Sequence, residues 1–68
     1  MATEQEGTLI EALTQAARWF EEYSDHHYAK ARTAGSYREQ GACEDKGKRN
    51  KERAEFLRAA IARATGEA

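Results

Sequence analysis

The sequence predicts an all-α protein: an antiparallel two-helix hairpin that pairs with a second copy to form a four-helix bundle. Three observations point to this fold class. The 68 residues contain no proline and are rich in the helix formers Ala, Glu, Arg and Lys. Apolar residues recur at steps of three and four in both halves of the chain. A single break near Gly35 separates the two halves, so all of residues 1–68 form one domain.

The first helix is expected over residues 8–33. Thr8-Leu9-Ile10-Glu11 has the form of a capping box, in which Thr8 caps the backbone and Glu11 reaches back. The seam that follows consists of Ile10, Leu13, Ala17, Phe20, Ser24, His27, Ala31 and Ala34. The stripe is widened by Leu9, Ala12, Ala16, Trp19 and Tyr23. A stripe this wide is typical of a helix that contacts more than one neighbour.

The turn is expected over residues 34–36. Gly35 suits a left-handed helix cap, and Ser36-Tyr37-Arg38-Glu39 is a second capping box. The second helix is therefore predicted over residues 37–65. Gly41 leaves an alternative open, in which residues 35–41 form a loop and the helix begins near Ala42.

The second helix has a seam of its own, and its residues near the turn are small. The seam residues are Cys43, Gly47, Asn50, Ala54, Leu57, Ile61 and Ala64. Small residues in this position would let the helices approach, with the bulky side chains of the first helix filling the space. Two seam residues are polar. Ser24 and Asn50 could form hydrogen bonds across helices or chains, or could meet water at the seam edge.

The chain is too short to be stabilised by a large core of its own. It has one cysteine, Cys43, so an intramolecular disulfide is excluded, and no Cys and His cluster has zinc-site spacing. Association is the remaining common route to stability, and a homodimer is expected. The predicted dimer core is Ile10, Leu13, Ala17, Trp19, Phe20, Tyr23, Ala54, Leu57 and Ile61. A tetramer through Trp19 stays open.

The charge pattern argues against a nucleic-acid partner. The net charge is −1, with −3 on residues 1–34 and +2 on residues 35–68. The densest basic run is Lys46, Lys48, Arg49, Lys51 and Arg53, and acidic residues interleave with it in the sequence. A neutralised run binds phosphate poorly, so a nucleic-acid-binding regulator is kept as an alternative function only.

No pattern in the chain predicts catalysis, a metal site or a cofactor. His26 and His27 are adjacent, so on a helix they point about 100° apart and cannot share one ion. Cys43 would need an oxyanion hole and a cleft to act as a nucleophile, and a two-helix hairpin supplies neither. We therefore expect a protein that is not an enzyme. The role of Asp25, His26 and His27 stays open.

The cytoplasm is the expected location. No apolar run approaches the roughly 18 residues of a membrane span. The acidic, polar N-terminal sequence does not have the form of a secretory signal, and a lone cysteine suits a reducing compartment.

Three residues are the candidates for contact with a foreign protein. Tyr37 and Arg38 lie near the hairpin tip, and Tyr28 falls off the predicted seam. Tyrosine and arginine are favoured as binding anchors.

Two segments carry a resemblance to a known family. They are Ala16-Ala17-Arg18-Trp19-Phe20-Glu21-Glu22-Tyr23, leading to His26-His27, and Asn50-Lys51-Glu52-Arg53-Ala54-Glu55-Phe56-Leu57-Arg58-Ala59-Ala60-Ile61. In these segments, and in length, the chain resembles the small moron proteins of temperate Pseudomonas phages, and among them the quorum-sensing anti-activators. The resemblance implies a dimerising helical hairpin in a bacterial host cell. It also implies binding to a LuxR-type transcription activator, and to the type IV pilus assembly ATPase as a second target.

The function expected from the sequence is stoichiometric occlusion of a host protein. A rigid bundle would mask the working surface of its partner without turnover. Three rivals remain: the nucleic-acid-binding regulator, a structural module whose only partner is itself, and a metal-dependent enzyme.

Overall fold

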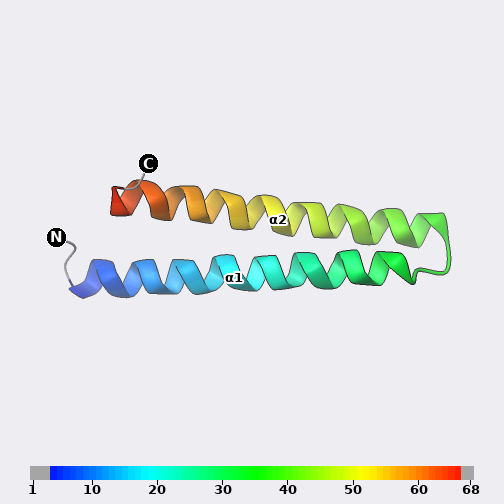
Figure 1. The fold of residues 1–68 in the computed structure, drawn as a ribbon, viewed down its shortest axis with the longest axis horizontal. Coiled ribbons are helices and arrows are strands. Elements are labelled where there is room, and N and C mark those ends of the chain that lie inside the picture. Colours follow the sequence, from blue (N-terminus) through cyan, green and yellow to red (C-terminus); the bar gives the residue numbers. More distant parts are fainter. Residues whose placement is uncertain (1–3, 67–68) are drawn as a thin grey trace.

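The computed structural model describes residues 4–66 and shows a helical hairpin (Figure 1). Helix α1 spans Glu4–Arg32 and helix α2 spans Tyr37–Thr65. The two helices run antiparallel and side by side, so both chain ends lie at the end opposite the turn. The molecule is a rod of 51 × 18 × 11 Å. The predicted fold class is confirmed at the level of the hairpin, and the described residues include no strand.

α1 begins about one helical turn earlier than predicted. The capping box expected at Thr8 does not form, because Thr8 lies inside the helix and its Oγ1 donates a hydrogen bond to the carbonyl oxygen of Glu4, 3.0 Å away. The preceding sequence has no proline to stop a helix, and Gly7 costs a helix only about 1 kcal/mol. Glu4 also interacts favourably with the positive end of the helix dipole, which supports the earlier start.

α1 ends without the left-handed glycine that the sequence suggested. The backbone N–H of Thr33 donates to the carbonyl oxygen of Lys30 at 3.2 Å, so the last turn tightens to a three-residue spacing. Among the described residues a positive φ occurs at Gly66 alone, where it is 79°, and the prediction for Gly35 is therefore wrong. Gly66 instead caps α2 in the left-handed conformation.

α2 begins at Tyr37, and the second capping box sets this start. The Oγ of Ser36 accepts a hydrogen bond from the N–H of Glu39 at 3.2 Å. The carboxylate of Glu39 reaches back to the N–H of Gly35, also at 3.2 Å, one residue earlier than in the usual box. The alternative start near Ala42 is therefore wrong, because residues 37–41 are already helical.

The seam between the helices is made of small side chains. The buried residues are Ala17, Ser24, Ala31, Gly47 and Ala54. The larger seam residues are half buried, namely Ile10, Leu13, Phe20, His27, Leu57 and Ile61. The predicted seam thus faces the partner helix, yet no large side chain among the described residues is fully enclosed. A core this thin contributes little burial energy, which fits a chain that needs association for stability.

One buried hydrogen bond joins the two helices. The Oγ of Ser24 donates to the carbonyl oxygen of Gly47 at 2.7 Å, so for Ser24 the first of the two alternatives holds, a hydrogen bond across the helices. Asn50 behaves differently, because its side-chain amide donates to the carbonyl oxygen of Lys46 in its own helix, at 2.8 Å. Of the two polar seam residues, Ser24 alone bonds across this hairpin.

Ser24→Ala is expected to lower the free energy of unfolding by about 1 kcal/mol, the typical net value of an intramolecular hydrogen bond. Asn50→Ala is the matched control. It should cost less, because it removes a hydrogen bond within one helix and alanine favours helix. Urea unfolding followed by circular dichroism measures both values. Equal losses in the two variants would show that the interhelical bond contributes nothing of its own.

The ring of Tyr28 packs against Gly47. A Cβ atom at position 47 would lie 2.9 Å from the Cε2 of Tyr28, so the ring fills the space that a side chain would need. The prediction that Tyr28 falls off the seam is therefore wrong, since the side chain is half buried over α2. The spacing of Tyr28 places its Cα beside the seam, but its long side chain reaches across.

Candidate protein-binding interface

Helical spacing divides the hairpin into two sides. In each helix the residue before a seam residue lies on one side, and the residue after it lies on the other. Because the helices are antiparallel, the preceding residues of both helices share one side. The guanidinium of Arg53, which precedes Ala54, accordingly lies 5.8 Å from the centroid of the Phe20 ring. Glu21 and Arg58, which both follow seam residues, pair with each other on the opposite side.

Large apolar side chains gather on the first of these sides. Leu9, Trp19 and Tyr23 of α1 each precede a seam residue, as does Phe56 of α2, and we call these four residues the apolar face. Their exposed fractions are 59%, 55%, 57% and 70%. Exposed apolar patches on a small protein mark binding surfaces, because water solvates them poorly. The apolar face is therefore the strongest candidate interface of the molecule.

The predicted dimer core divides between the seam and this face. Ala17 and Ala54 are buried within one hairpin, and the aliphatic members are half buried between its helices. Trp19 and Tyr23 are exposed, so the single hairpin leaves them available for a further contact. The dimer itself stays a prediction.

The opposite side of the hairpin is polar. Arg58 binds Glu21 through two hydrogen bonds, one from Nη2 to Oε1 and one from Nε to Oε2 at 3.3 Å. The hydrogen bond from Arg58 lowers the pKa of Glu21. The pair's contribution to stability is therefore present above the usual value of 4.5 and is lost as the pH falls through the lowered pKa. Both side chains are about half exposed, so solvent screening keeps this contribution small.

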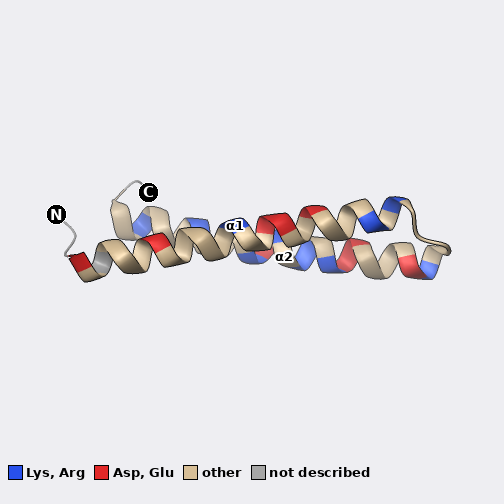
Figure 2. Cartoon of the chain, turned by 90° about the horizontal axis from the view of Figure 1, so that it is seen from below, with Lys and Arg blue, Asp and Glu red and all other residues tan. Residues whose placement is uncertain are grey.

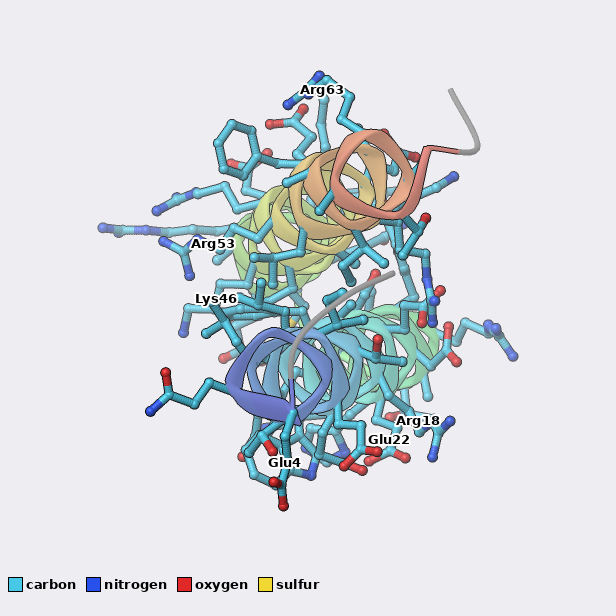
Figure 3. The ribbon with its side chains drawn as sticks, turned by 90° about the vertical axis from the view of Figure 1, so that its left-hand side faces the viewer. Glu4, Arg18, Glu22, Lys46, Arg53 and Arg63 are labelled. Atoms are coloured by element: carbon cyan, nitrogen blue, oxygen red, sulfur yellow. The ribbon has the colours of Figure 1, made fainter. Side chains whose placement is uncertain are left out.

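The basic run of α2 is less neutralised in space than in sequence. Lys46, Arg49 and Arg53 each precede a seam residue, so they form a line on the side of the apolar face, and we call them the basic row. Figure 3 shows Lys46 and Arg53 projecting to the same side of the hairpin. None of the acidic residues that interleave with them directly precedes a seam residue, although Glu52 lines a groove together with Arg49 and Arg53. The predicted local neutralisation is therefore partial.

The hairpin tip carries the other predicted contact residues. Tyr37 is 92% exposed at the first position of α2, and Arg38 beside it is exposed as well. Tyr28 does not join them, because its ring lies over Gly47. Figure 2 shows basic residues at the end of α1 next to the turn, and these include Lys30 and Arg32. The tip is thus a polar, positively charged end with one projecting aromatic ring.

The histidine pair lies on α1, and Cys43, a free and half-buried cysteine, lies on α2. The His26 and His27 rings lie edge to face with their centroids 5.7 Å apart. No cluster of three metal-ligating side chains occurs within the described part of the chain. Burial lowers the pKa of His27, and repulsion from His26, Lys46 and Lys30 lowers it further. His27 is therefore a half-buried seam residue whose surroundings disfavour its protonated form.

The hairpin is expected to lose stability as the pH falls below 6.5, the usual histidine pKa. The unfolded chain takes up a proton near that pH, whereas folded His27 resists it, so protonation favours unfolding. His27→Gln should flatten this dependence. His26→Gln is the matched control and should keep most of it, because burial of His27 is the main cause. Thermal unfolding midpoints across this pH range provide the measurement, and an unchanged slope in His27→Gln would contradict the prediction.

Comparison with known proteins returns no relative: no family model, no curated protein and no solved structure matches the chain. None of the described helices has the length and apolar character needed to cross a membrane. A hairpin fold by itself implies no function, so a function has to be inferred from the side chains on the surface of the hairpin.

Two features of this surface escaped the sequence reasoning. The Glu21 to Arg58 pair and the basic row were both hidden among many charged residues. The sequence does contain the positions of these residues, because Glu21 and Arg58 directly follow seam residues and the residues of the basic row directly precede them. Sorting the charged residues by their position relative to the seam would therefore have predicted both features.

Proposed function

We propose that this protein acts without catalysis, by binding other protein chains, and that its first partner is a second copy of itself. The exposed apolar face carries this proposal. Trp19, Tyr23 and Phe56 are each more than half exposed, although they are the kind of residue that anchors protein interfaces. The hairpin core consists of alanine, glycine and serine, so a second hairpin would supply the burial that one copy lacks.

The two-fold dimer should be centred on Leu9, Trp19 and Phe56 of this side. The alanines Ala12 and Ala60 lie on the same side. A two-fold interface places the same surface of both copies together. If it extended over the basic row, it would bury cations without counter-ions, which is costly. The turn end of each hairpin therefore stays free for another partner.

The proposed action on that further partner is occlusion. A rod with a rigid tip can cover the working surface of a larger protein in a fixed ratio, without turnover. Tyr37 and Arg38 project from the tip, where they are accessible in the dimer that we propose. The resemblance to phage anti-activators suggests a LuxR-type activator as the occluded protein, with the pilus assembly ATPase second. We place this action in the cytoplasm of a bacterial host, where Cys43 would stay reduced.

The test mixes the protein with a purified LuxR-type activator and its operator DNA and follows the mobility of the DNA. Occlusion predicts that the activator is released from DNA at an equal molar ratio, and that Tyr37→Ala/Arg38→Ala removes the effect. Lys48→Ala/Lys51→Ala, on exposed positions elsewhere on α2, is the control and should behave as wild type. Retained DNA binding at excess wild-type protein would exclude this partner and favour a module that associates with itself alone.

A further inference from the structure

The side of the hairpin that carries the apolar face differs between the two helices. On α1 it carries Leu9, Trp19 and Tyr23, and on α2 it carries the basic row followed by Phe56. Lys46, Arg49 and Arg53 are all exposed. In Figure 3, Lys46 and Arg53 point away from the side on which Arg18 and Glu22 lie. The basic row is therefore a continuous cationic line beside an apolar surface.

No ion pair of the described side chains involves the basic row. The Glu21 to Arg58 pair is the one ion pair among them, and it lies on the other side. α1 adds further positive charge near the row, since Lys30 and Lys46 both contribute to lowering the pKa of His27. Glu52 lies in one groove with Arg49 and Arg53, so the cations outnumber the carboxylates there.

A groove lies beside Arg49 and Arg53 of the basic row. Its lining residues are Phe20, Arg49, Glu52, Arg53, Phe56 and Leu57. Phe20 and Leu57 are half-buried seam residues, and Phe56 is 70% exposed. Phe56 also belongs to the apolar face, so a helix in this groove would cover part of the surface that the proposed dimer uses. Arg53 lies over the Phe20 ring, with its guanidinium 5.8 Å from the ring centroid. An apolar side chain could enter here while acidic groups beside it meet the arginines.

We propose that the basic row and this groove bind an acidic amphipathic helix of a partner protein. Lys46, Arg49 and Arg53 follow one another at steps of three and four, so they present about one cation per helical turn. A partner helix with carboxylates at the same steps and an apolar residue between them matches both charge and shape. This inference rests on the proposed protein-binding function and names the chemistry of the surface that would be bound.

Two other occupants fit less well. The same side of a second copy offers no carboxylate to the basic row, because α1 carries Leu9, Trp19 and Tyr23 in the corresponding positions. A nucleic acid would meet only a short line of cations on a protein of net charge −1, and Glu52 lines the same groove. Few phosphate contacts give weak, salt-sensitive binding. An acidic helix needs fewer cations and also uses the apolar walls.

The test uses a fluorescent helical peptide built from glutamate and leucine, with leucines at steps of three and four, and the intact protein. Fluorescence anisotropy should show binding that weakens with salt. Arg49→Glu/Arg53→Glu should weaken it by at least about tenfold, because two charge pairs become repulsive. Lys48→Glu/Lys51→Glu makes the same change in net charge at positions outside the basic row, and should change the affinity by less than about twofold.

A glutamine-for-glutamate peptide and a single-stranded oligonucleotide of about 20 nucleotides complete the set. No binding of the acidic peptide, equal binding of the glutamine peptide, or equal losses in the two charge variants would each overturn the proposal. Tighter binding of the oligonucleotide would overturn it in favour of a phosphate-binding surface. Sedimentation of the same samples reports self-association. Absence of peptide binding by the wild-type protein, together with an intact dimer, refutes this inference and leaves dimerisation standing.

Discussion

Gly47→Leu is expected to destabilise the hairpin by about 3 kcal/mol, the upper range for overpacking a closed site. The new Cβ would lie 2.9 Å from the Cε2 of Tyr28 and 3.1 Å from its Cζ, before the rest of the leucine is added. The clash would also separate the helices where Ser24 donates to the Gly47 carbonyl oxygen. Urea unfolding monitored by circular dichroism measures the loss.

Gly41→Leu is the matched control, because it makes the same change in the same helix. A Cβ at Gly41 has no atom within 4 Å, so the variant should gain about 0.5 kcal/mol from helix propensity. Tyr28→Ala combined with Gly47→Leu should recover part of the lost stability, because removal of the ring opens the space. If Gly47→Leu were as stable as Gly41→Leu, the close packing of Tyr28 on α2 would be refuted.

Trp19→Asp/Phe56→Asp is expected to convert the dimer to monomer. Each aromatic anchor contributes about 2 kcal/mol or more at an interface core, so the dissociation constant should rise at least about 100-fold. A charge buried in the apolar contact adds a further penalty. Light scattering coupled to size-exclusion chromatography gives the mass of each sample.

Tyr37→Asp serves as the control for this experiment. It replaces one aromatic side chain by aspartate, where the double variant replaces two, at a position that is 92% exposed at the tip, outside the proposed dimer contact. The variant should remain dimeric. If Tyr37→Asp were monomeric, or if Trp19→Asp/Phe56→Asp remained dimeric, the dimer interface could not lie on the apolar face as proposed.

The seam was predictable because burial in a helix pair is periodic. Steps of three and four placed Ala17, Ser24 and Ala54 between the helices, and the structure has all three buried there. The start of α2 was predictable for a local reason, since the Ser36 hydroxyl meets the N–H of Glu39 within a single turn.

The remaining features depend on competition between possible helix starts, or on how close the two helices lie to each other. Thr8 has a capping sequence, but the helix continues past it because the earlier residues form helix equally well. The side on which Tyr28 lies follows from spacing, whereas the reach of its ring over Gly47 depends on how closely the helices approach. The line formed by Lys46, Arg49 and Arg53 depends on their positions relative to the seam, which a count of charges along the chain does not show.

We propose that this hairpin binds other chains and that its first partner is a second copy of itself. Sedimentation equilibrium of the wild-type protein at micromolar concentration tests this proposal directly. The expected mass is twice the 7.6 kDa of one chain, with a reversible dependence on concentration. A folded particle of 7.6 kDa at every concentration would contradict it, because Trp19, Tyr23 and Phe56 would then stay exposed without a second copy to cover them.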